Sequence, residues 1–367
     1  MGVRRSELEA PARAARPTHR TPEPSLALRA LLTALACANT GCQATPGPIF
    51  PDIRPPIVWP PPPDRPRIRY VGQLVGEASL GARPSGMAAL RAALEGPPAQ
   101  GAFSTPTAVA LAGERVYVAD LQLGAVHLLD LAARRYASIT AAAGEPLESP
   151  IDVAVAEDAL AVADSRRQAV LVFTLDGREL RSIGAGVLQR PAAVAWNPGA
   201  RELWVLDSAA HACLIFSLAG EFLRRVGERG AGPLQFNYPA GLTYRAPFGA
   251  VVADSMNFRV QCLAPAGEPR LIFGQKGDAA GDFALPRDVA VDSEGHMYVL
   301  DNQFENVQIF DDAGRLLMAF GREGRGRGEF YLPSGITIDE QDRIWIADTY
   351  NRRVQVFQYL RAPEDQP

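Results

Sequence analysis

The sequence predicts an all-β fold, a six-bladed β-propeller, and three observations support this. One pattern recurs six times: a proline opens a short apolar strand, and a second apolar strand then ends in aspartate. The aspartates lie 43 to 47 residues apart, a period typical of propeller blades. Short strands alternate apolar and polar residues between turns. The six pairs are Pro106 and Asp120, Pro150 and Asp164, Pro191 and Asp207, Pro239 and Asp254, Pro286 and Asp301, and Pro333 and Asp348.

The copy that begins at Pro286 shows how one blade is built. Residues 289–292 alternate as a first strand, 297–300 form the second, 307–309 the third, and 315–320 the fourth. A single blade of this kind cannot bury both of its faces. We therefore expect the six copies to pack side by side and close into a ring.

The sixth copy lacks its fourth strand, because few residues follow Phe357. A strand of matching character, RIRYVGQL, lies before the first copy at Arg67 to Leu74. We expect Ile68 to Leu74 to form the outer strand of the last blade. This pairing closes the ring and covers a strand edge that would otherwise be exposed.

Several motifs of these copies resemble NHL repeats. The segments that show the resemblance are PSGITIDEQDRIWIADTYNRRVQVF (Pro333 to Phe357), PRDVAVDSEGHMYVLDNQFENVQIF (Pro286 to Phe310), and the glycine-rich connectors at Gly274 to Phe283 and Gly321 to Phe330. The resemblance covers roughly residues 67 to 360. It is stronger from Pro239 onward, because the first three copies lack the asparagine-arginine turn. It implies a six-bladed propeller but no single activity, since the family includes lyases, ligase substrate-binding domains, RNA binders and envelope proteins.

The segment 1–45 reads as a disordered leader with a signal peptide. Leu26 to Ala36 is an apolar run interrupted by Arg29, too short to span a membrane. Cys37 or Cys42 follows as a candidate lipidation site of a bacterial lipoprotein. Ordinary secretion and a cytosolic disordered arm remain alternatives. The favoured prediction places the protein at the cell envelope, held by a lipid anchor and not by a transmembrane helix.

Three further segments complete the domain organisation. Residues 46–66 are a proline-rich linker, expected to form a semi-rigid polyproline II spacer. The propeller itself is assigned to 67–360, with a short helical insertion near 76–105 and a tail at 361–367. Within the insertion, Met87 to Leu94 has the spacing of a short amphipathic helix.

Composition and motifs restrict the function. A net charge of −4 disfavours nucleic acid as a partner. His127, His211 and His296 stand at different places in their blades, so they do not form the ring of ligands that a metal on the axis needs. The sequence has no haem, phosphate-loop or nucleophile-elbow motif. We therefore expect no cofactor and no metal.

Two sets of blade residues have structural explanations. Cys213 and Cys262 replace apolar residues of third strands, so we expect buried free thiols. The six blade aspartates could form a ring of acids. Five of them precede Ser, Thr or Asn, which favours the capping of turns by bonds to backbone amides.

The candidate site is the face on which the turns between second and third strands meet the connectors between blades. Arginines beside exposed aromatic residues are typical of recognition surfaces, although solvated loop charge would look the same. The candidate binding residues are Arg259, Arg287, Arg322, Arg325, Arg327, Tyr350 and Arg353, and Asp152 and Asp288 are candidates for the mouth of the channel.

The sequence favours a non-catalytic binding or scaffolding propeller that recognises a protein, peptide or glycan through its loop face. The alternative is a hydrolase or lyase, lactonase-like or amidating-lyase-like, that acts in the central channel. Three or more convergent polar side chains at one point of the channel would distinguish the enzyme.

Overall fold

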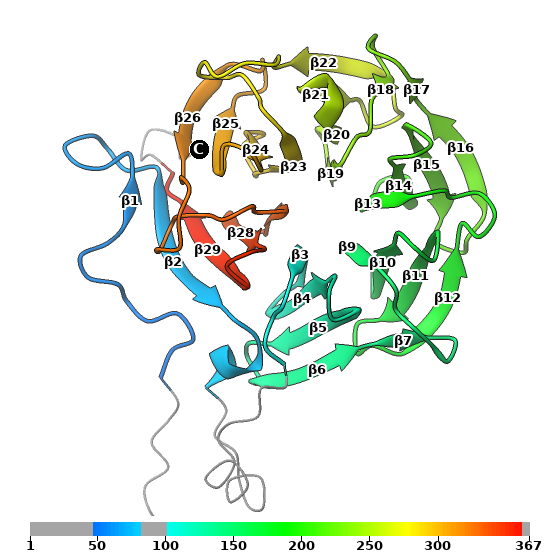
Figure 1. Cartoon of the computed structure of the whole chain (residues 1–367), viewed down its shortest axis with the longest axis horizontal. Helices are drawn as coiled ribbons and strands as arrows, with labels where there is room; N and C mark the ends of the chain where they lie inside the picture. Colours follow the sequence, from blue (N-terminus) through cyan, green and yellow to red (C-terminus); the bar gives the residue numbers. More distant parts are fainter. Residues whose placement is uncertain (1–46, 82–100, 362–367) are drawn as a thin grey trace, which may run out of the picture. The chain divides into compact units, whose positions relative to one another are not determined.

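The computed structural model describes residues 47–81 and 101–361. Six antiparallel sheets stand around a central axis, and the chain passes from one to the next in sequence order (Figure 1). The predicted six-bladed propeller is confirmed. In blades 1 to 5 the first strand of each sheet lies at the axis and the fourth at the rim.

The first three blades have four strands each. Blade 1 comprises β3 (Pro106–Ala112), β4 (Arg115–Asp120), β5 (Ala125–Asp130) and β6 (Arg135–Ile139). Blade 2 comprises β9 (Pro150–Ala156), β10 (Ala159–Asp164), β11 (Ala169–Thr174) and β12 (Glu179–Ile183). Blade 3 comprises β13 (Pro191–Asn197), β14 (Glu202–Asp207), β15 (Ala212–Ser217) and β16 (Phe222–Val226).

The last three blades follow the same plan, with one addition. Blade 4 comprises β19 (Gly241–Arg245), β20 (Gly249–Asp254), β21 (Arg259–Leu263) and β22 (Pro269–Phe273). Blade 5 comprises β23 (Pro286–Val291), β24 (Met297–Asp301), β25 (Asn306–Phe310) and β26 (Leu316–Phe320). Blade 6 comprises β27 (Gly335–Ile338), β28 (Arg343–Asp348), β29 (Arg353–Tyr359), β2 (Ile68–Leu74) and β1 (Val58–Trp59).

Short elements lie between the blades. Two-stranded pairs form in two connectors, and two 3₁₀ turns flank strands. They are β7 (Ala141–Ala142) with β8 (Glu145–Pro146), β17 (Glu228–Arg229) with β18 (Gln235–Phe236), η1 (Glu77–Leu80) and η2 (Ser255–Asn257). Among the described residues, no helix has the length and apolar character needed to cross a membrane.

The predicted closure by an N-terminal strand is confirmed. β2 pairs antiparallel with β29, with Ile68 opposite Tyr359 and Leu74 opposite Val354. The Leu360 amide donates to the Arg67 carbonyl over 2.7 Å and extends the pairing beyond the strand. The first and last parts of the ring therefore share one sheet (Figure 1).

The hydrophobic core is divided among the six interfaces between neighbouring blades. Six clusters of buried side chains form in the described residues, one for each interface. Second strands supply much of this core, because both of their faces meet a neighbouring blade; Trp204 and Trp345 are fully buried in them. Burial on both faces explains why these strands read as continuous apolar runs.

The turn between second and third strands has one backbone geometry in all six blades. The residue four positions after the blade aspartate is left-handed, with φ between 52° and 57°. These residues are Gly124, Gln168, His211, Phe258, Glu305 and Arg352. Only blade 1 places glycine there, so the other five accept a strain of roughly 1 kcal/mol each.

The proline-rich segment is not a free spacer over its described part. β1 pairs with β2, and the Trp59 ring lies 5.8 Å from the rings of Phe320 and Phe357. Phe50 meets Trp345 edge-on at 6.0 Å. Among the described residues, 47–59 therefore pack on the propeller. The apolar residues between the prolines provide contacts that a reading of proline content alone does not consider.

The insertion near 76–105 is described only at its two ends. It begins with η1, in which Leu80 is buried, and it returns to the propeller at Phe103, which is also buried. Gly76 and Ala102 form a β-bridge that joins the two ends. The amphipathic helix expected at Met87 to Leu94 lies outside the described residues.

Candidate functional site

The turns after second strands and the connectors between blades meet on one face, called here the loop face. Hydrogen bonds between the two sets of loops establish this. The Ser208 amide donates to the Arg190 carbonyl over 3.0 Å, and the Asn302 amide donates to the Leu285 carbonyl over 3.0 Å. The predicted arrangement of the loops is confirmed.

The blade aspartates are buried turn caps, as the sequence indicated. Asp301 shows the pattern, because its carboxylate accepts the amides of Gln303 and Phe304 in the turn. It also accepts the amides of Ala284 and Leu285 in the connector that enters the same blade. The blade aspartates therefore join two loops of the face, which leaves them engaged within the protein.

The residue after the blade aspartate often bonds to the next blade. The Ser165 hydroxyl donates to the Pro191 carbonyl over 2.5 Å, and the Ser255 hydroxyl donates to the Pro286 carbonyl over 2.6 Å. The Thr349 hydroxyl donates to the Pro106 carbonyl over 2.7 Å and so links the last blade to the first. These polar residues hold neighbouring blades together beside the axis.

Arg259 and Arg353, two of the predicted binding residues, hold their guanidinium groups in contacts within the protein. Arg353 is 6 % exposed and bonds Asp348 over 2.7 Å, and it also donates to the carbonyls of Gly326 and Glu329. Arg259 repeats this arrangement on Asp254. Each arginine faces the carbonyls of its own glycine-rich connector, because that loop leaves several backbone oxygens without strand partners.

The other arginines of the connector before blade 6 are exposed. Arg322 forms an ion pair with Glu329 over 2.8 Å, and the Arg325 guanidinium lies 5.8 Å from the Tyr331 ring centroid. Arg327 is exposed as well. Tyr350 is 62 % exposed and packs against Tyr331. This group lies on the connector and is separate from the channel.

A cavity of about 840 Å³ opens on the loop face at the end of the central channel. We call it the axial basin. Loops and inner strands of five blades form its wall. The wall lies around the axis because it includes the second residues of β9, β13 and β23. Its lining residues are Leu121, Ser149, Ile151, Ser165, Arg166, Gln168, Gln189, Arg190, Ala192, Ser208, Ala209, Tyr238, Pro239, Ala240, Ser255, Met256, Leu285 and Arg287.

The basin combines an amphipathic edge with polar walls. Tyr238 and Met256 are 46 % and 44 % exposed at this edge. The Tyr238 ring is fixed by His211, whose ring centroid lies 4.6 Å away and whose Nδ1 accepts the Tyr238 amide. Apolar and polar side chains line this concave site in similar number, so it offers both hydrophobic contact and the convergent polar groups that orient a ligand in a small-molecule pocket.

A second cavity, the channel chamber, occupies the part of the channel nearer the opposite face. Its volume is about 520 Å³, and residues of all six inner strands line it, Asp152 and Asp288 among them. The Asp152 carboxylate accepts the Val194 amide over 2.7 Å, and Asp288 accepts the Ile336 amide over 2.8 Å. Each aspartate thus bonds the next blade from within the channel wall.

The position of Asp288 also explains a glycine in the neighbouring blade. A Cβ atom at Gly241 would lie 2.5 Å from the Asp288 Oδ1 atom and from its Cα atom. Glycine is therefore required where β19 approaches β23 most closely. The inner strands are spaced so tightly here that any larger residue would displace the carboxyl.

The two channel carboxyls titrate abnormally. Burial raises the pKa of Asp152 to about 7, although hydrogen bonds from backbone amides oppose the shift. Burial and the nearby Asp152 raise the pKa of Asp288 well above its usual range. Burial lowers the pKa of Arg287, while Asp288 and Asp152 act in the opposite direction. The charges of Asp152, Arg287 and Asp288 therefore interact electrostatically in a poorly solvated region.

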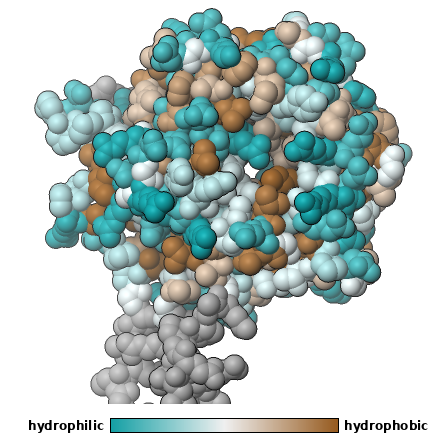
Figure 2. Space-filling view, in the orientation of Figure 1, coloured by the Kyte–Doolittle hydropathy of each residue, from teal (hydrophilic) through white to brown (hydrophobic). Residues whose placement is uncertain are grey.

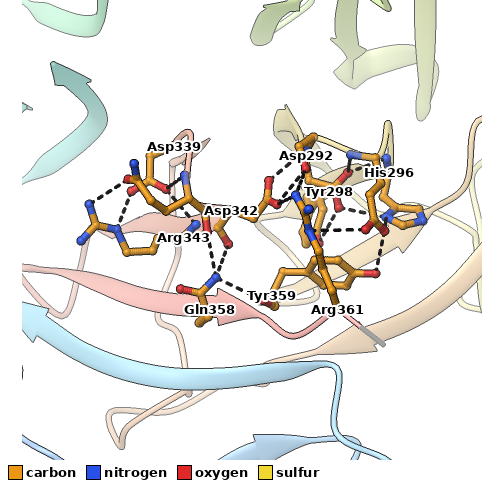
Figure 3. A network of polar contacts seen from close by, with 12 residues as sticks. Asp292, His296, Tyr298, Asp339, Asp342, Arg343, Gln358, Tyr359 and Arg361 are labelled. Carbon is orange, nitrogen blue, oxygen red and sulfur yellow. Dashed lines mark hydrogen bonds and ion pairs between the residues drawn. The ribbon is translucent and has the colours of Figure 1, made fainter. Parts of the chain in front are cut away.

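A polar network at the turns between first and second strands serves the fold (Figure 3). Asp292 lies 2.9 Å from the His296 ring nitrogen and accepts the Tyr298 hydroxyl over 3.1 Å. Asp339 binds Arg343 and the Trp345 indole in the same way one blade later. Hydrogen bonding to Asp292 raises the pKa of His296. Because the arrangement repeats between blades, we interpret it as a turn anchor.

Arg361 connects this network to the end of the chain (Figure 3). Its guanidinium bonds Asp342 over 2.6 Å, and the Tyr359 hydroxyl donates to Glu294 over 3.0 Å. The first contact holds Arg361 to the turn between β27 and β28, and the second joins the end of β29 to the turn between β23 and β24. They are on the face opposite the axial basin, so they do not take part in the candidate site.

The structure brings together basin residues that the sequence prediction did not select. Arg287 was predicted, whereas Arg190 and Tyr238 were not. Both immediately precede the proline that opens an inner strand. In a ring of blades that position lies at the mouth of the channel, so the repeat alignment could have identified them.

Cys213 and Cys262 are buried free thiols, as expected. Burial raises the pKa of both to about 12, which leaves them as thiols at neutral pH. Among the described residues, no group of three or more His, Cys, Asp or Glu side chains could hold a metal ion. Cys37 and Cys42 lie outside the described part of the chain.

Sequence comparison identifies the repeat. The NHL repeat family model matches residues 330–357, which cover the strands β27 to β29. The sixth blade is an NHL repeat. No curated protein matches the chain significantly. The NHL match therefore agrees with the resemblance seen in the sequence, where the last copies keep the motif best.

Solved structures similar to this chain show the fold. A protein of unknown function from Bacteroides thetaiotaomicron has 16% identity and a TM-score of 0.58, with 71% of this chain and 70% of that chain covered. An auxiliary nutrient binding protein from Bacteroides ovatus has 13% identity, a TM-score of 0.56, and 71% coverage of both chains. A catalytically inactive virginiamycin B lyase from Staphylococcus aureus has 11% identity and a TM-score of 0.52, with 70% and 80% covered.

Figure 2 shows one face of the disc hollowed at its centre, with hydrophilic and hydrophobic side chains around the hollow. The loops and turns of several blades border it. Every inner strand contributes to the wall of the channel, so all six blades meet there. A molecule held there contacts several blades at once, which a site on any single rim loop does not offer.

Proposed function

We propose that the protein is a non-catalytic binding propeller that takes up its ligand in the axial basin of the loop face. The observation that carries this proposal is the basin itself, a cavity of about 840 Å³ lined by five blades. Its volume lies within the range of roughly 300 to 1,000 Å³ found for ligand pockets. The similarity to nutrient-binding propellers supports the same reading.

The sequence predicts a protein, peptide or glycan as the partner. We propose that this partner binds at the loop face. The exposed Arg322, Arg325, Arg327 and Tyr350 extend the binding surface from the basin toward the rim. A macromolecular partner would contact this rim while one of its groups occupies the basin.

Ligand capture by the full-length protein tests the proposal. The protein is incubated with the low-molecular-mass fraction of a bacterial envelope extract, washed, and denatured, and the released compounds are identified by mass spectrometry. Ala240 lines the basin, so A240W fills it, whereas A280W adds the same side chain at an exposed site outside the basin. We expect capture by the wild type and A280W, and loss of capture in A240W at an unchanged thermal midpoint.

Equal capture by A240W and the wild type would contradict the proposal, because a filled basin would then hold the same compounds. Retention of no compound by any folded form would contradict it as well. The captured compounds also identify the ligand directly.

An enzyme that acts in the channel chamber is the second candidate. The raised pKa of Asp152 and of Asp288 favours it, because perturbed carboxyls in a cavity are typical of catalytic sites. Against it, both carboxylates already bond a backbone amide of the next blade. A binding function therefore explains more of the site.

We further propose that the protein acts at the cell envelope. The apolar run at Leu26 to Ala36, followed at once by Cys37 and Cys42, supports an exported chain with a lipid anchor. A binding propeller with few free thiols and a ligand basin is suited to that location, where it would meet ligands before they enter the cell.

A further inference from the structure

The axial basin has an uncompensated positive charge. Arg166, Arg190 and Arg287 line it, and none of its lining residues is acidic. The three arginines come from separate elements: the turn after β10, the connector before β13, and the inner strand β23. Their convergence on one cavity therefore depends on the closed ring and not on a local sequence cluster.

None of these three guanidinium groups forms a hydrogen bond or ion pair with another described residue, in contrast to Arg259 and Arg353. Two neutral polar groups of the basin are also available, because the Ser149 hydroxyl and the Gln189 amide make no side-chain hydrogen bond in the described part of the chain. The basin therefore offers free donors together with its charges.

Arg287 is the most enclosed of the three. It is half-buried, whereas Arg166 and Arg190 are exposed. Asp152 and Asp288 lie below it in the channel chamber, but neither forms an ion pair with it. Burial raises the pKa of Asp152 to about 7 and raises that of Asp288 well above its usual range. Three arginines and no acidic residue line the basin, so the field within it is positive, and low solvation strengthens it.

We propose that the axial basin binds a small hydroxylated organic anion, whose carboxylate or phosphate group is taken up by Arg287 while Ser149 and Gln189 bond its hydroxyl groups. Arginine suits this task because its planar group can donate two parallel hydrogen bonds to one oxyacid. The proposal rests on the binding function argued above and names the class of ligand.

A small ligand fits better than a nucleic acid. The basin encloses a molecule of limited size, and the whole chain carries a net charge of −4, which repels an extended polyanion. Tyr238 adds an amphipathic ring beside the arginines. It can cover the apolar side of a hydroxylated ring while the charged group points to the floor.

Calorimetry with matched probes tests the ligand class. The full-length protein is titrated with glucuronate and with glucose 6-phosphate, and in parallel with glucose as the neutral twin of both. We expect at least one acidic probe to bind with a Kd at least 10-fold lower than that of glucose, and its affinity to fall as salt is raised. The two acidic probes separate a carboxylate ligand from a phosphate ligand.

The variant R287M removes the charge at the floor of the basin while it keeps the length of the side chain. R178M makes the same change in net charge at an exposed arginine outside the basin. We expect R287M to raise the Kd of the acidic probe at least 10-fold and to leave the Kd of glucose unchanged. R178M should bind both probes like the wild type. Thermal midpoints confirm that both variants fold.

Three outcomes would overturn the inference: equal affinity for glucose and the acidic probes, unchanged binding in R287M, or binding of a heparin or RNA oligomer but of no small anion. If envelope compounds are captured and all are neutral, the basin binds ligands but the anion assignment fails. If A240W captures compounds like the wild type, the basin itself is not the site, and the proposed function fails first.

Discussion

Two arginines of the loop face differ in what they can bind, although their chemistry is the same. Arg353 stands five residues after a blade aspartate, where its guanidinium meets the carbonyls of a glycine-rich connector. Arg287 stands directly after a blade proline, where the backbone has strand partners and the side chain faces the channel. The position within the blade therefore decides whether an arginine supports the fold or is free for a ligand.

Loss of the Arg353 side chain should destabilise the propeller. R353M leaves the buried Asp348 carboxylate with one cationic partner fewer and frees connector carbonyls that the guanidinium had bonded. We expect the free energy of unfolding in urea to fall by about 3 kcal/mol, the range for breaking a buried ion pair. R325M, which changes an exposed arginine of the same connector, should cost less than about 0.5 kcal/mol. Equal costs for the two variants would show that Arg353 is a surface arginine after all.

Stability should fall as the pH rises because of Asp152. Its folded pKa of about 7 exceeds the ordinary value of 3.8, so the folded protein holds more protons between these values than the unfolded chain. The asparagine of D152N stays neutral and still accepts the Val194 amide. We expect D152N to be more stable than the wild type at pH 8 by about 1 kcal/mol, and the gain to vanish near pH 4. The expected gain is smaller than the pKa shift alone implies, because water in the channel screens the carboxyl.

Urea unfolding of both proteins from pH 4 to pH 8 measures this difference. D158N, which changes an exposed carboxyl beside the same blade, serves as the control. If the free energies of unfolding of D152N and the wild type differed by the same amount at every pH, the raised pKa of Asp152 would be refuted. A carboxyl that titrates in this range must change the difference with pH.

At this scale the sequence predicts capping roles better than binding roles. The blade aspartates recur with the period, so their common task could be recognised without a structure. Arg287 was selected, and Arg190 and Tyr238 could have been, because each immediately precedes the proline of a copy. Their convergence in one cavity could not be predicted, since it depends on how far apart the inner strands stand. Asp152 and Asp288 were expected at the mouth of the channel. Their poor solvation could not be predicted, because the local sequence pattern does not encode how far a carboxyl lies from solvent.

Among the elements, β2 and the segment before it have the largest effect on the closed ring. β2 supplies the fourth strand of blade 6, and Trp59 and Phe50 add aromatic contacts outside it. Closure was predicted from the missing fourth strand and the character of 68–74. The packing of 47–59 was not, because proline density suggested a solvated rod and obscured the four apolar anchors Phe50, Ile53, Ile57 and Trp59.

Truncations should separate these contributions. Chains that start at residue 47, 61 or 76 keep both segments, β2 alone, or neither. We expect the thermal midpoint to fall by about 5 °C when 47–60 are removed, because aromatic packing worth a few kcal/mol is lost. Removal of β2 as well should lower it at least twice as much. Calorimetry measures the midpoints, and equal values for the last two chains would contradict closure by β2.

The connector before blade 6 should tolerate the loss of its exposed arginines. R322A, R325A and R327A combined remove one surface ion pair and leave every backbone carbonyl that bonds Arg353 in place. We expect the free energy of unfolding to change by less than about 1 kcal/mol. A pull-down from envelope extract should capture less partner, with a smaller deficit at high salt because exposed charges are screened. An unchanged partner list would leave these side chains as solvated loop charge.

For the whole molecule, the ring replaces one continuous core by six interfaces of similar kind. Each blade needs only the right residues toward its two neighbours, which explains how the first three blades keep the fold after losing the asparagine-arginine turn. Fold class could therefore be predicted from period and alternation alone. Ligand chemistry could not, because the basin is formed by loops of five blades, and no single repeat contains it.

The proposed envelope location gives a prediction for the whole chain. Palmitate supplied to a bacterial host should label the full-length protein, since lipid transfer to a cysteine after an apolar signal would anchor it. The combined change C37S and C42S should abolish the label. Label that persists in the double variant, or no label on the wild type, would rule out lipidation at these cysteines. The single changes identify which cysteine is used.

The pairing of β2 with β29 has a mechanical consequence. Ile68 opposes Tyr359, and the next bond joins Arg67 to Leu360, so the strands meet at the point where both leave the sheet. Once 47–59 have been detached, a pulling force between Arg67 and Leu360 loads this bond first and then its neighbours one at a time, as in a zipper. A load carried only by the N-terminal end, with the resistance on the far side of the ring, is instead shared as shear along β2. The propeller should therefore resist tension on a tether far better than tension between its own ends.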